Sequence, residues 1–295
     1  MSRTESFTRV GFAYVVAFAA GASWFAWGPE TPWLWLDGLI ADLIATLVVF
    51  VASRIHHNSS FYDAYWSVLP PLLMLGWWIE SGTPVDDPRS WLVMAVILLW
   101  AIRLTGNWIY AFPGLHHEDW RYPMVRDKAG KAEAVADLMG IHVFPTLQVF
   151  LGMLPVYVVL TRTYHGFTWL DLLAVVIGLG AVVLEFTADL QMYRFARTRQ
   201  PGQAMDQGLW GWSRHPNYFG EFSFWLSLAL FGLAADPGTW WWIYVGAAAM
   251  YAMFQGASIP MMEQRSLERR PAYAEVIGRV PRFMPRPPRR NGAVE

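Results

Sequence analysis

The sequence contains no cysteine and few charged residues. Without cysteine the chain has no disulfide, no thiolate metal site and no cysteine nucleophile, although this absence alone does not fix the redox compartment. Charged residues make up 15% of the 295 residues, whereas hydrophobic residues make up 55%. This composition is too apolar for an ordinary soluble domain, and several apolar runs are long enough to cross a bilayer. The sequence therefore predicts a multi-pass membrane protein.

Internal repeats, low-complexity segments and a Rossmann fingerprint are also missing. The nearest candidate fingerprint, Gly178-Leu179-Gly180, lies inside an apolar run with no strand before it, so we expect these glycines to allow close helix packing instead. The first apolar run begins near Val10 without a convincing cleavage site, so we expect no cleavable signal peptide. These observations favour a single membrane-embedded domain over residues 1–295.

The apolar runs predict an all-α fold, a polytopic bundle of membrane helices. Two long loops, 112–142 and 188–216, and the tail from Ile259 hold most of the soluble residues, which favours one compact domain over a membrane anchor with a separate enzyme. We expect eight spans, at residues 10–27, 34–52, 62–79, 91–111, 143–161, 169–187, 217–235 and 239–258.

The positive charges predict the orientation of these spans. All but three of the 22 Lys and Arg residues fall in segments on one side of the bundle, the exceptions being Arg89, Arg103 and Arg162. By the positive-inside rule, both termini and the loops 112–142 and 188–216 face the cytoplasm. The expected location is the inner membrane of a bacterium.

The stretch Gly208–Glu221 carries the densest polar chemistry of the chain and opens directly into an apolar run. Pro216 suits the first turn of a helix, because its missing N–H needs no partner there. Asn217 and Glu221 then share one helical face just inside the membrane boundary, where an amide and a carboxylate are costly unless they bind something. Arg214 and His215 stand at the helix N-terminus, which favours an anion such as phosphate.

Polar residues in the earlier spans are further candidates. The third span opens with Tyr62, Asp63 and Tyr65, an acid and two phenols that can polarise a carbonyl or deliver a proton. Arg103 is the basic residue placed within a span, so it needs an anionic partner. That partner is either Asp63, in a structural pair, or a phosphate of a ligand.

Carboxylates and arginines also meet at the end of the sixth span. Glu185 and Asp189 lie four residues apart, and three arginines follow at once: Arg194, Arg197 and Arg199. Arginine forks match phosphate oxygens, so this segment can hold the sugar and phosphates of a nucleotide or, alternatively, anchor the helix by its positive charge. By contrast, the adjacent histidines His116 and His117 lack the spacing of a rigid metal site, and we expect no metal.

The segment Arg214–Glu221, Arg-His-Pro-Asn-Tyr-Phe-Gly-Glu, resembles the C-terminal signature of the steroid 5α-reductase family, including its bacterial branch long catalogued as a domain of unknown function. The resemblance is clearest over residues 185–285 and fainter over residues 62–122. It implies a core of seven transmembrane helices around NADPH, so eight spans here mean one additional N-terminal helix.

The resemblance also implies an activity and a set of site residues. The family reduces a carbon–carbon double bond conjugated to a carbonyl, using NADPH. Asn217 and Glu221 are implied to contact the nicotinamide end. Asp189, Arg194, Arg197 and Tyr218 are implied to line the nucleotide. Arg103, Arg214 and His215, whose charges suit phosphate, complete the expected cofactor site.

This sequence departs from the steroid enzymes on the proton side of the reaction. Their glutamate precedes a Leu-Pro pair on an early helix, and the matching position before Leu69-Pro70 is Val68. Tyr62, Asp63 or Tyr65 then has to act as the catalytic acid, or the substrate is not a steroid enone.

Two other classes of function stay open. Membrane methyltransferases of the isoprenylcysteine and phospholipid type, which use S-adenosylmethionine, have a similar Arg-His-Pro element, and the tail Glu263–Pro281 fits them as well. A lipid-binding protein without catalysis is the other alternative. Asn217 and Glu221 favour the reductase. We expect a lipophilic, steroid- or isoprenoid-like substrate and the lipid bilayer as partners, and no nucleic acid.

Overall fold

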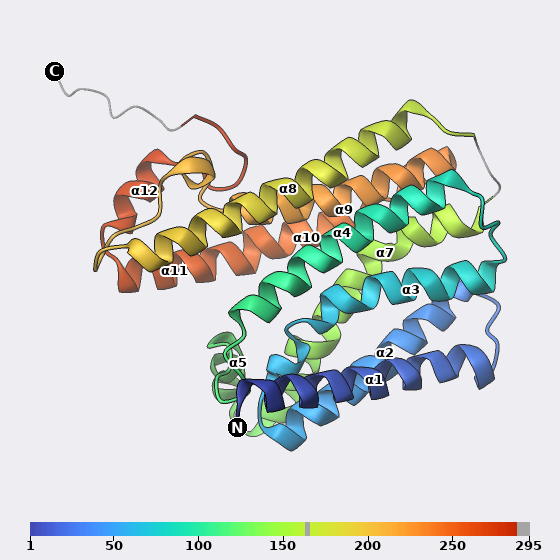
Figure 1. Ribbon diagram of the computed structural model, residues 1–295, viewed down its shortest axis with the longest axis horizontal. Coiled ribbons are helices and arrows are strands. Elements are labelled where there is room, and N and C mark those ends of the chain that lie inside the picture. Colours follow the sequence, from blue (N-terminus) through green and yellow to red (C-terminus); the bar gives the residue numbers. More distant parts are fainter. Residues whose placement is uncertain (163–165, 288–295) are drawn as a thin grey trace.

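The computed structural model of the protein describes residues 1–162 and 166–287. Over these ranges the chain consists of helices and connecting turns, with no strand. Figure 1 shows an elongated bundle with the N-terminus and the C-terminal helices at the same end. Arg289 and Arg290, which belong to the predicted cytoplasmic tail, lie outside the described residues.

Six helical segments of the described chain are long and apolar enough to span a membrane. The predicted class, an all-α polytopic membrane bundle, is confirmed. In one of the six, α5 (Arg121–Ala129), α6 (Glu133–Ala136) and a π-helical stretch (Asp137–Val143) lead into α7 (Phe144–Thr161). The other five are α1 (Arg3–Trp27), α2 (Leu34–His56), α4 (Pro88–Ala111), α8 (Trp169–Thr198) and α9 (Pro216–Ala235).

The two remaining predicted spans differ from the expectation. The third is α3 (Tyr65–Ser81), which has 17 residues and two internal prolines. The last begins only at α10 (Val245–Met253), because Pro237 and Gly238 favour a turn where a helix start was expected. From α10 the chain continues through a π-helical stretch (Phe254–Ser258) into α11 (Ile259–Arg269), and α12 (Tyr273–Arg279) follows.

Helix α9 lies in the middle of the main core and packs most extensively against α8 and α7. This core contains the fully buried rings of Trp77, Trp100 and Trp225. Gly178 on α8 allows close helix contact, since a Cβ there would lie 2.7 Å from Val96 Cγ1 and 2.9 Å from Ser227 Oγ. The predicted packing role is therefore confirmed for Gly178. For Gly180 it is wrong, because a Cβ there would meet no atom within 4 Å.

The segment after α12 holds the start of α9 in place. Ser213 Oγ donates to the carbonyl of Phe283 at 2.7 Å, and the Arg214 backbone N–H donates to the carbonyl of Pro281 at 2.9 Å. Helix α9 begins at Pro216, as predicted. The motif therefore lies between the bundle and the C-terminal segment.

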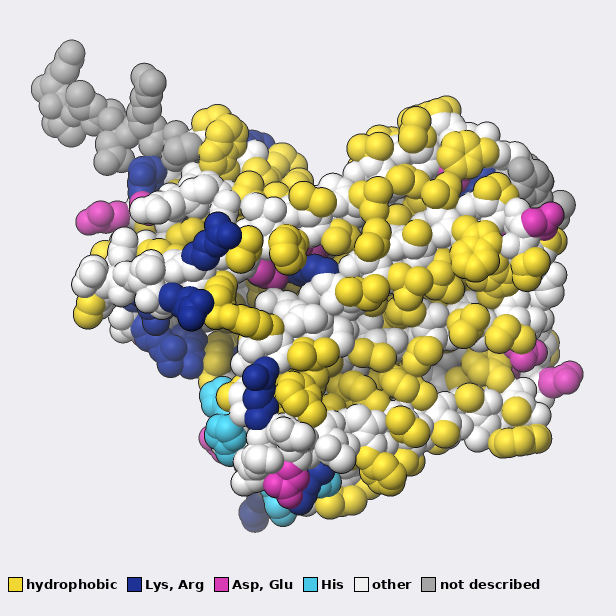
Figure 2. Space-filling view, viewed as in Figure 1, with side chains coloured by type: hydrophobic (Ala, Val, Ile, Leu, Met, Phe, Trp, Pro, Cys, Tyr) yellow, Lys and Arg dark blue, Asp and Glu magenta, His cyan; other side chains and the backbone are white. Residues whose placement is uncertain are grey.

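The surface separates apolar from positive side chains. Hydrophobic side chains cover the sides of the bundle in Figure 2, and Lys and Arg gather toward the end that carries α5, α11 and α12. This separation agrees with a protein that spans a bilayer. The compartment that this positive end faces stays a prediction.

Candidate functional site

Arg103 stands at the centre of a buried cluster formed by α4, α8 and the start of α9. Its guanidinium forms ion pairs with Glu185, through Nη1, and with Asp189, through Nη2 at 2.6 Å. Asn107 Nδ2 on α4 donates to Asp189 Oδ2 at 3.1 Å, and the Asn217 side chain approaches Asp189 from α9. Together with Glu221 on α9, these residues, Arg103, Glu185, Asp189 and Asn217, are called the carboxylate cluster below.

Glu221 is held by two indoles. Trp100 Nε1 on α4 donates to Glu221 Oε2 at 3.1 Å, and Trp225 Nε1 donates to Glu221 Oε1 at 2.8 Å. Close contact between α8 and α9 is possible because residue 220 is glycine: a Cβ there would lie 2.4 Å from Glu185 Cγ. Glu221 is thus a buried carboxylate with a defined orientation.

The carboxylate cluster unites four of the residues that the sequence nominated for cofactor binding: Arg103, Asp189, Asn217 and Glu221. The expected alternative pair of Arg103 with Asp63 is wrong, because the guanidinium pairs with Glu185 and Asp189. Asp63 lies before α3, away from this cluster. Arg103 pairs with residues of α8 because α4 packs against α8.

Arg214 and His215 face the C-terminal segment. Arg214 Nε pairs with Glu263 at 2.7 Å, and its Nη1 donates to the carbonyls of Ile277 and Val280. His215 Nε2 donates to the same Glu263 oxygen at 3.2 Å. These donors therefore bind α11 and the segment around α12, and the contacts fix the entry to α9.

Burial and these contacts set the charge of the pair. Burial lowers the pKa of His215, although Glu263 opposes the shift, so the imidazole favours its neutral form. Burial acts to raise the pKa of Glu263, but hydrogen bonds from His215 and Arg214 outweigh it and lower that pKa overall. Glu263 is thus a stable carboxylate partner for Arg214.

Tyr218 lies in a stack of rings on the same turn. Its ring is parallel to that of Phe254, at 4.8 Å between centroids, and nearly parallel to that of His215, at 5.6 Å. This stack joins α9 to the π-helical stretch before α11. A π-helical turn is frequent at functional sites, and here it brings an aromatic face to the motif.

Tyr62 and Tyr65 belong to a separate polar group between α2, α3 and α7. The hydroxyls of Tyr62 and Thr146 form a hydrogen bond of 2.8 Å. The Tyr65 hydroxyl donates to Asp42 Oδ1 at 3.2 Å, and Thr46 bridges Asp42 and Thr146. The structure thus places these two phenols apart from the carboxylate cluster, with partners of their own.

Asp63 makes its contact apart from Tyr62 and Tyr65. It lies two residues before α3, outside the membrane helix, and accepts a hydrogen bond of 2.6 Å from the Tyr122 hydroxyl. Burial raises the pKa of Asp63 to about 6, against the opposing effect of Tyr122. The three nominated catalytic residues therefore lie in two places.

The arginines that follow the carboxylates on α8 also separate. Arg194 and Arg197 lie exposed on the last turns of α8, and the Arg197 guanidinium lies 5.3 Å from the centre of the Tyr193 ring. Arg199, just after the helix, lines a cavity of about 380 Å³ with Gln200, Pro201, Gly202, Arg269 and Arg270. We call this cavity the arginine pocket.

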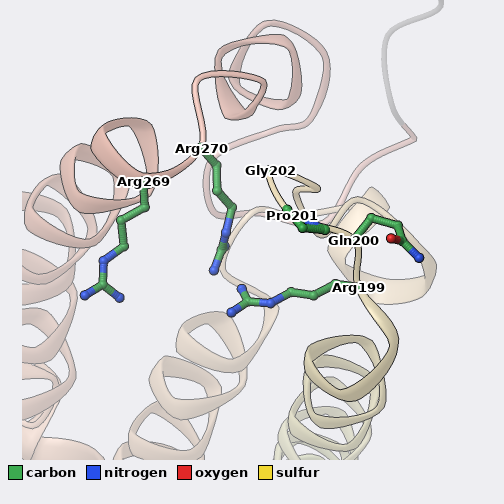
Figure 3. Close-up of a pocket in the computed structure, with 6 residues that line it drawn as sticks. All are labelled: Arg199, Gln200, Pro201, Gly202, Arg269 and Arg270. Carbon is green, nitrogen blue, oxygen red and sulfur yellow. The ribbon is translucent and has the colours of Figure 1, made fainter.

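The arginine pocket combines three positive charges with no acidic residue in its lining. Figure 3 shows the side chains of Arg199 and Arg270 reaching toward one another, while Arg269 projects from α11. Burial first, and then repulsion by Arg199 and Arg269, lowers the pKa of Arg270. Such a cluster is stabilised by an anion, and guanidinium groups suit phosphate.

Sequence reasoning did not identify four residues of these sites. Trp100 and Trp225 carried no signal, since each occurs in an apolar run where packing is the ordinary role of an indole. Arg269 and Arg270 were counted with the positive residues of the tail. Only the fold of α11 against the end of α8 brings them to Arg199.

The fold and these sites define a polytopic helical membrane protein with a buried carboxylate cluster and an arginine pocket. The chain belongs to the family described as "Protein of unknown function (DUF1295)", whose profile matches residues 49–280. An uncharacterized protein of Schizosaccharomyces pombe is 29% identical over 273 residues, which cover 84% of this chain and 79% of that protein. No solved structure matches the chain.

Proposed function

We propose that the protein is a reductase that uses NADPH to reduce a carbon–carbon double bond conjugated to a carbonyl in a lipophilic substrate. The motif Arg214–Glu221 resembles the steroid 5α-reductase signature, and this resemblance supplies the reaction class. The observation that supports the proposal most is that α8 and the residue after it link the two polar sites, since Asp189 lies on α8 and Arg199 directly follows the helix. Asp189 and Arg199 are ten residues apart, about 15 Å along a helix.

The residues present fit a phosphorylated dinucleotide. The arginine pocket offers three guanidinium groups without a competing acid, so Arg199, Arg269 and Arg270 would hold phosphate. At the other site, Asn217 and the carboxylates of the cluster offer the acceptors and donors that an amide requires. NADPH supplies a hydride when bound.

A lipophilic substrate agrees with the surroundings of the carboxylate cluster. Glu185 and Glu221 lie on membrane helices, within a core of tryptophan and phenylalanine rings. Apolar pockets bind sterol, isoprenoid and fatty groups alike, because such surfaces discriminate weakly by shape. The proposal therefore names the reacting group and leaves the hydrocarbon part general.

Binding of NADPH to the purified protein tests the cofactor assignment. Titration calorimetry should detect NADPH binding, and Arg199→Ala, Arg269→Ala or Arg270→Ala should each weaken it about ten- to a hundredfold, since a hydrogen bond to a charged group contributes roughly 1.5–3 kcal/mol. Arg9→Ala, on the exposed face of α1, is the matched control and should leave binding unchanged. Equal affinity in all four variants would exclude the arginine pocket.

The reaction itself is tested with deuterium at the reactive nicotinamide carbon. A single turnover with sterol, isoprenoid and fatty enones should place the deuterium in the reduced product. Consumption of S-adenosylmethionine with methylation of a lipid, and no deuterium transfer, would instead establish the methyltransferase alternative.

A further inference from the structure

Glu185 has one oxygen that nothing in the described chain satisfies. Its Oε2 accepts from Arg103, whereas Oε1 is buried and has no hydrogen-bond donor. The residue is only 1% exposed, so water does not compensate. An unsatisfied carboxylate oxygen in such a place carries the full penalty of losing its water. A proton on this oxygen removes that cost, if an acceptor is near.

Glu221 is that acceptor. The Glu185 carboxyl faces Glu221 where α8 meets α9: a Cβ at Gly220, the residue before Glu221, would lie 3.2 Å from Glu185 Oε1. Two ionised carboxylates offer four acceptors and no donor, so such a contact requires a proton on one of them. Both oxygens of Glu221 already accept from indole N–H groups, which favours its ionised form. The proton therefore belongs to Glu185.

The charge balance of the cluster also favours a bound proton. The charged groups that face Glu185 are Arg103 from α4, Asp189 on α8 itself and Glu221 from α9. One guanidinium cannot neutralise three carboxylates, and a net charge of minus two is costly inside a membrane protein. A single proton reduces this excess charge.

We propose that Glu185 carries a proton on Oε1, donated to Glu221, and that this proton is the one delivered to the substrate. The second part rests on the proposed reduction. Saturating a double bond requires a hydride, with its two electrons, on one carbon and a proton on the other. The Glu185 O–H bond breaks as the new C–H bond forms, which leaves a carboxylate.

Glu185 can regain its proton from the neighbouring side chain. Asp189 shares Arg103 with Glu185, and its side chain is 20% exposed, whereas that of Glu185 is 1% exposed. Water therefore reaches the cluster at Asp189. Glu185 is thus assigned the role of proton donor. Trp100 and Trp225 are positioning residues, which act through their hydrogen bonds to Glu221.

Infrared spectroscopy tests the proton independently of any activity. The carbonyl stretch of a protonated carboxylic acid should be present at pH 7 and lose intensity in Glu185→Gln, whose amide keeps both a donor toward Glu221 and an acceptor for Arg103. Asp42→Asn identifies the contribution of Asp42, another buried carboxyl with an unpartnered oxygen. Glu268→Gln, an exposed change on α11, should leave the band intact.

A second variant keeps the test valid if Glu185→Gln does not fold. In Glu221→Gln, the amide N–H can donate to Glu185 Oε1, so Glu185 no longer needs a proton and the band should again lose intensity. An unchanged band in a folded Glu185→Gln or Glu221→Gln protein would overturn the assignment.

Kinetics test the delivery of the proton. General acid catalysis typically contributes 10²–10⁴-fold, so Glu185→Gln should lower kcat about 100-fold or more while NADPH affinity changes less than about threefold. Wild-type turnover should also show a solvent deuterium isotope effect that the variant alters. An unchanged kcat would overturn the donor role, whereas a wild-type protein inactive with every enone would overturn the proposed function and leave the infrared result standing.

Discussion

Trp225 donates its indole N–H to Glu221 Oε1 at 2.8 Å from one turn further along the same helix. The two side chains therefore share a face of α9, and the indole fixes the carboxylate from the core side. Trp100 holds the second oxygen from α4. Glu221 is thus oriented before any ligand arrives, which is the condition for accurate positioning of a reacting group.

Replacing Trp225 with phenylalanine removes this donor and leaves a buried oxygen without it. We expect Trp225→Phe to lower the free energy of unfolding by about 2 kcal/mol, because a hydrogen bond to a charged group is lost in the core. Thermal unfolding in detergent measures the change. Trp91→Phe is the control, since Trp91 is exposed and donates to a backbone carbonyl near the surface. Equal stability of both variants would contradict the role of Trp225.

Removing Arg103 should be more damaging. Arg103→Ala leaves the Asp189 carboxylate without its cation and removes the donor to Glu185 Oε2, and breaking a buried ion pair in this way costs about 3–5 kcal/mol. The double variant Arg103→Ala/Asp189→Asn should recover part of this loss, because one excess negative charge is removed. Thermal midpoints of the single and double variants measure the recovery. No recovery would show that Arg103 acts through packing alone.

The class of the fold was accessible from the sequence, because apolar runs and Pro216 report local preferences. The partners of Arg103 were not, since Asp63 and the pair Glu185 and Asp189 are equally acidic and only helix adjacency distinguishes them. The start of the last predicted span was also wrong, because its residues are compatible with two local structures. Its apolar tryptophans suit a helix or an interfacial turn, and Pro237 decides in favour of the turn.

The His215 and Glu263 pair predicts a loss of stability in acid. The pKa of His215 is lowered below 6.5, so protons bind the unfolded chain first and stability falls as the pH drops below about 6.5. The pKa of Glu263 is lowered below 4.5, so its contribution is present above pH 4.5 and is lost as the pH falls through the folded-state value. Both groups therefore act in the same direction.

Thermal midpoints measured from pH 8 to pH 4 test this expectation. His215→Gln should flatten the decline that begins below about pH 6.5, whereas His116→Gln, an exposed change, should leave the slope as it is. A wild-type profile without a decline in this range would contradict it.

The absence of cysteine makes the predicted orientation directly measurable. Single cysteines at Ala132 and Gln203, both exposed, should be shielded from a membrane-impermeant thiol reagent in intact cells. A cysteine at Val85, which is 77% exposed at the other end of the bundle, should be labelled readily. The reverse pattern would invert the topology.

The contact between Ser213 and Phe283 joins residues 70 positions apart and has a consequence for biosynthesis. During translation, α9 is synthesised before Pro281 and Phe283. Until those residues leave the ribosome, Ser213 and the Arg214 backbone N–H at the start of α9 have no C-terminal acceptors. The Arg214 side chain likewise lacks the carbonyls of Ile277 and Val280. The membrane helices can therefore form before the C-terminal contacts of the motif do. A truncation that removes this segment should yield inserted protein in which the start of α9 is not held in place.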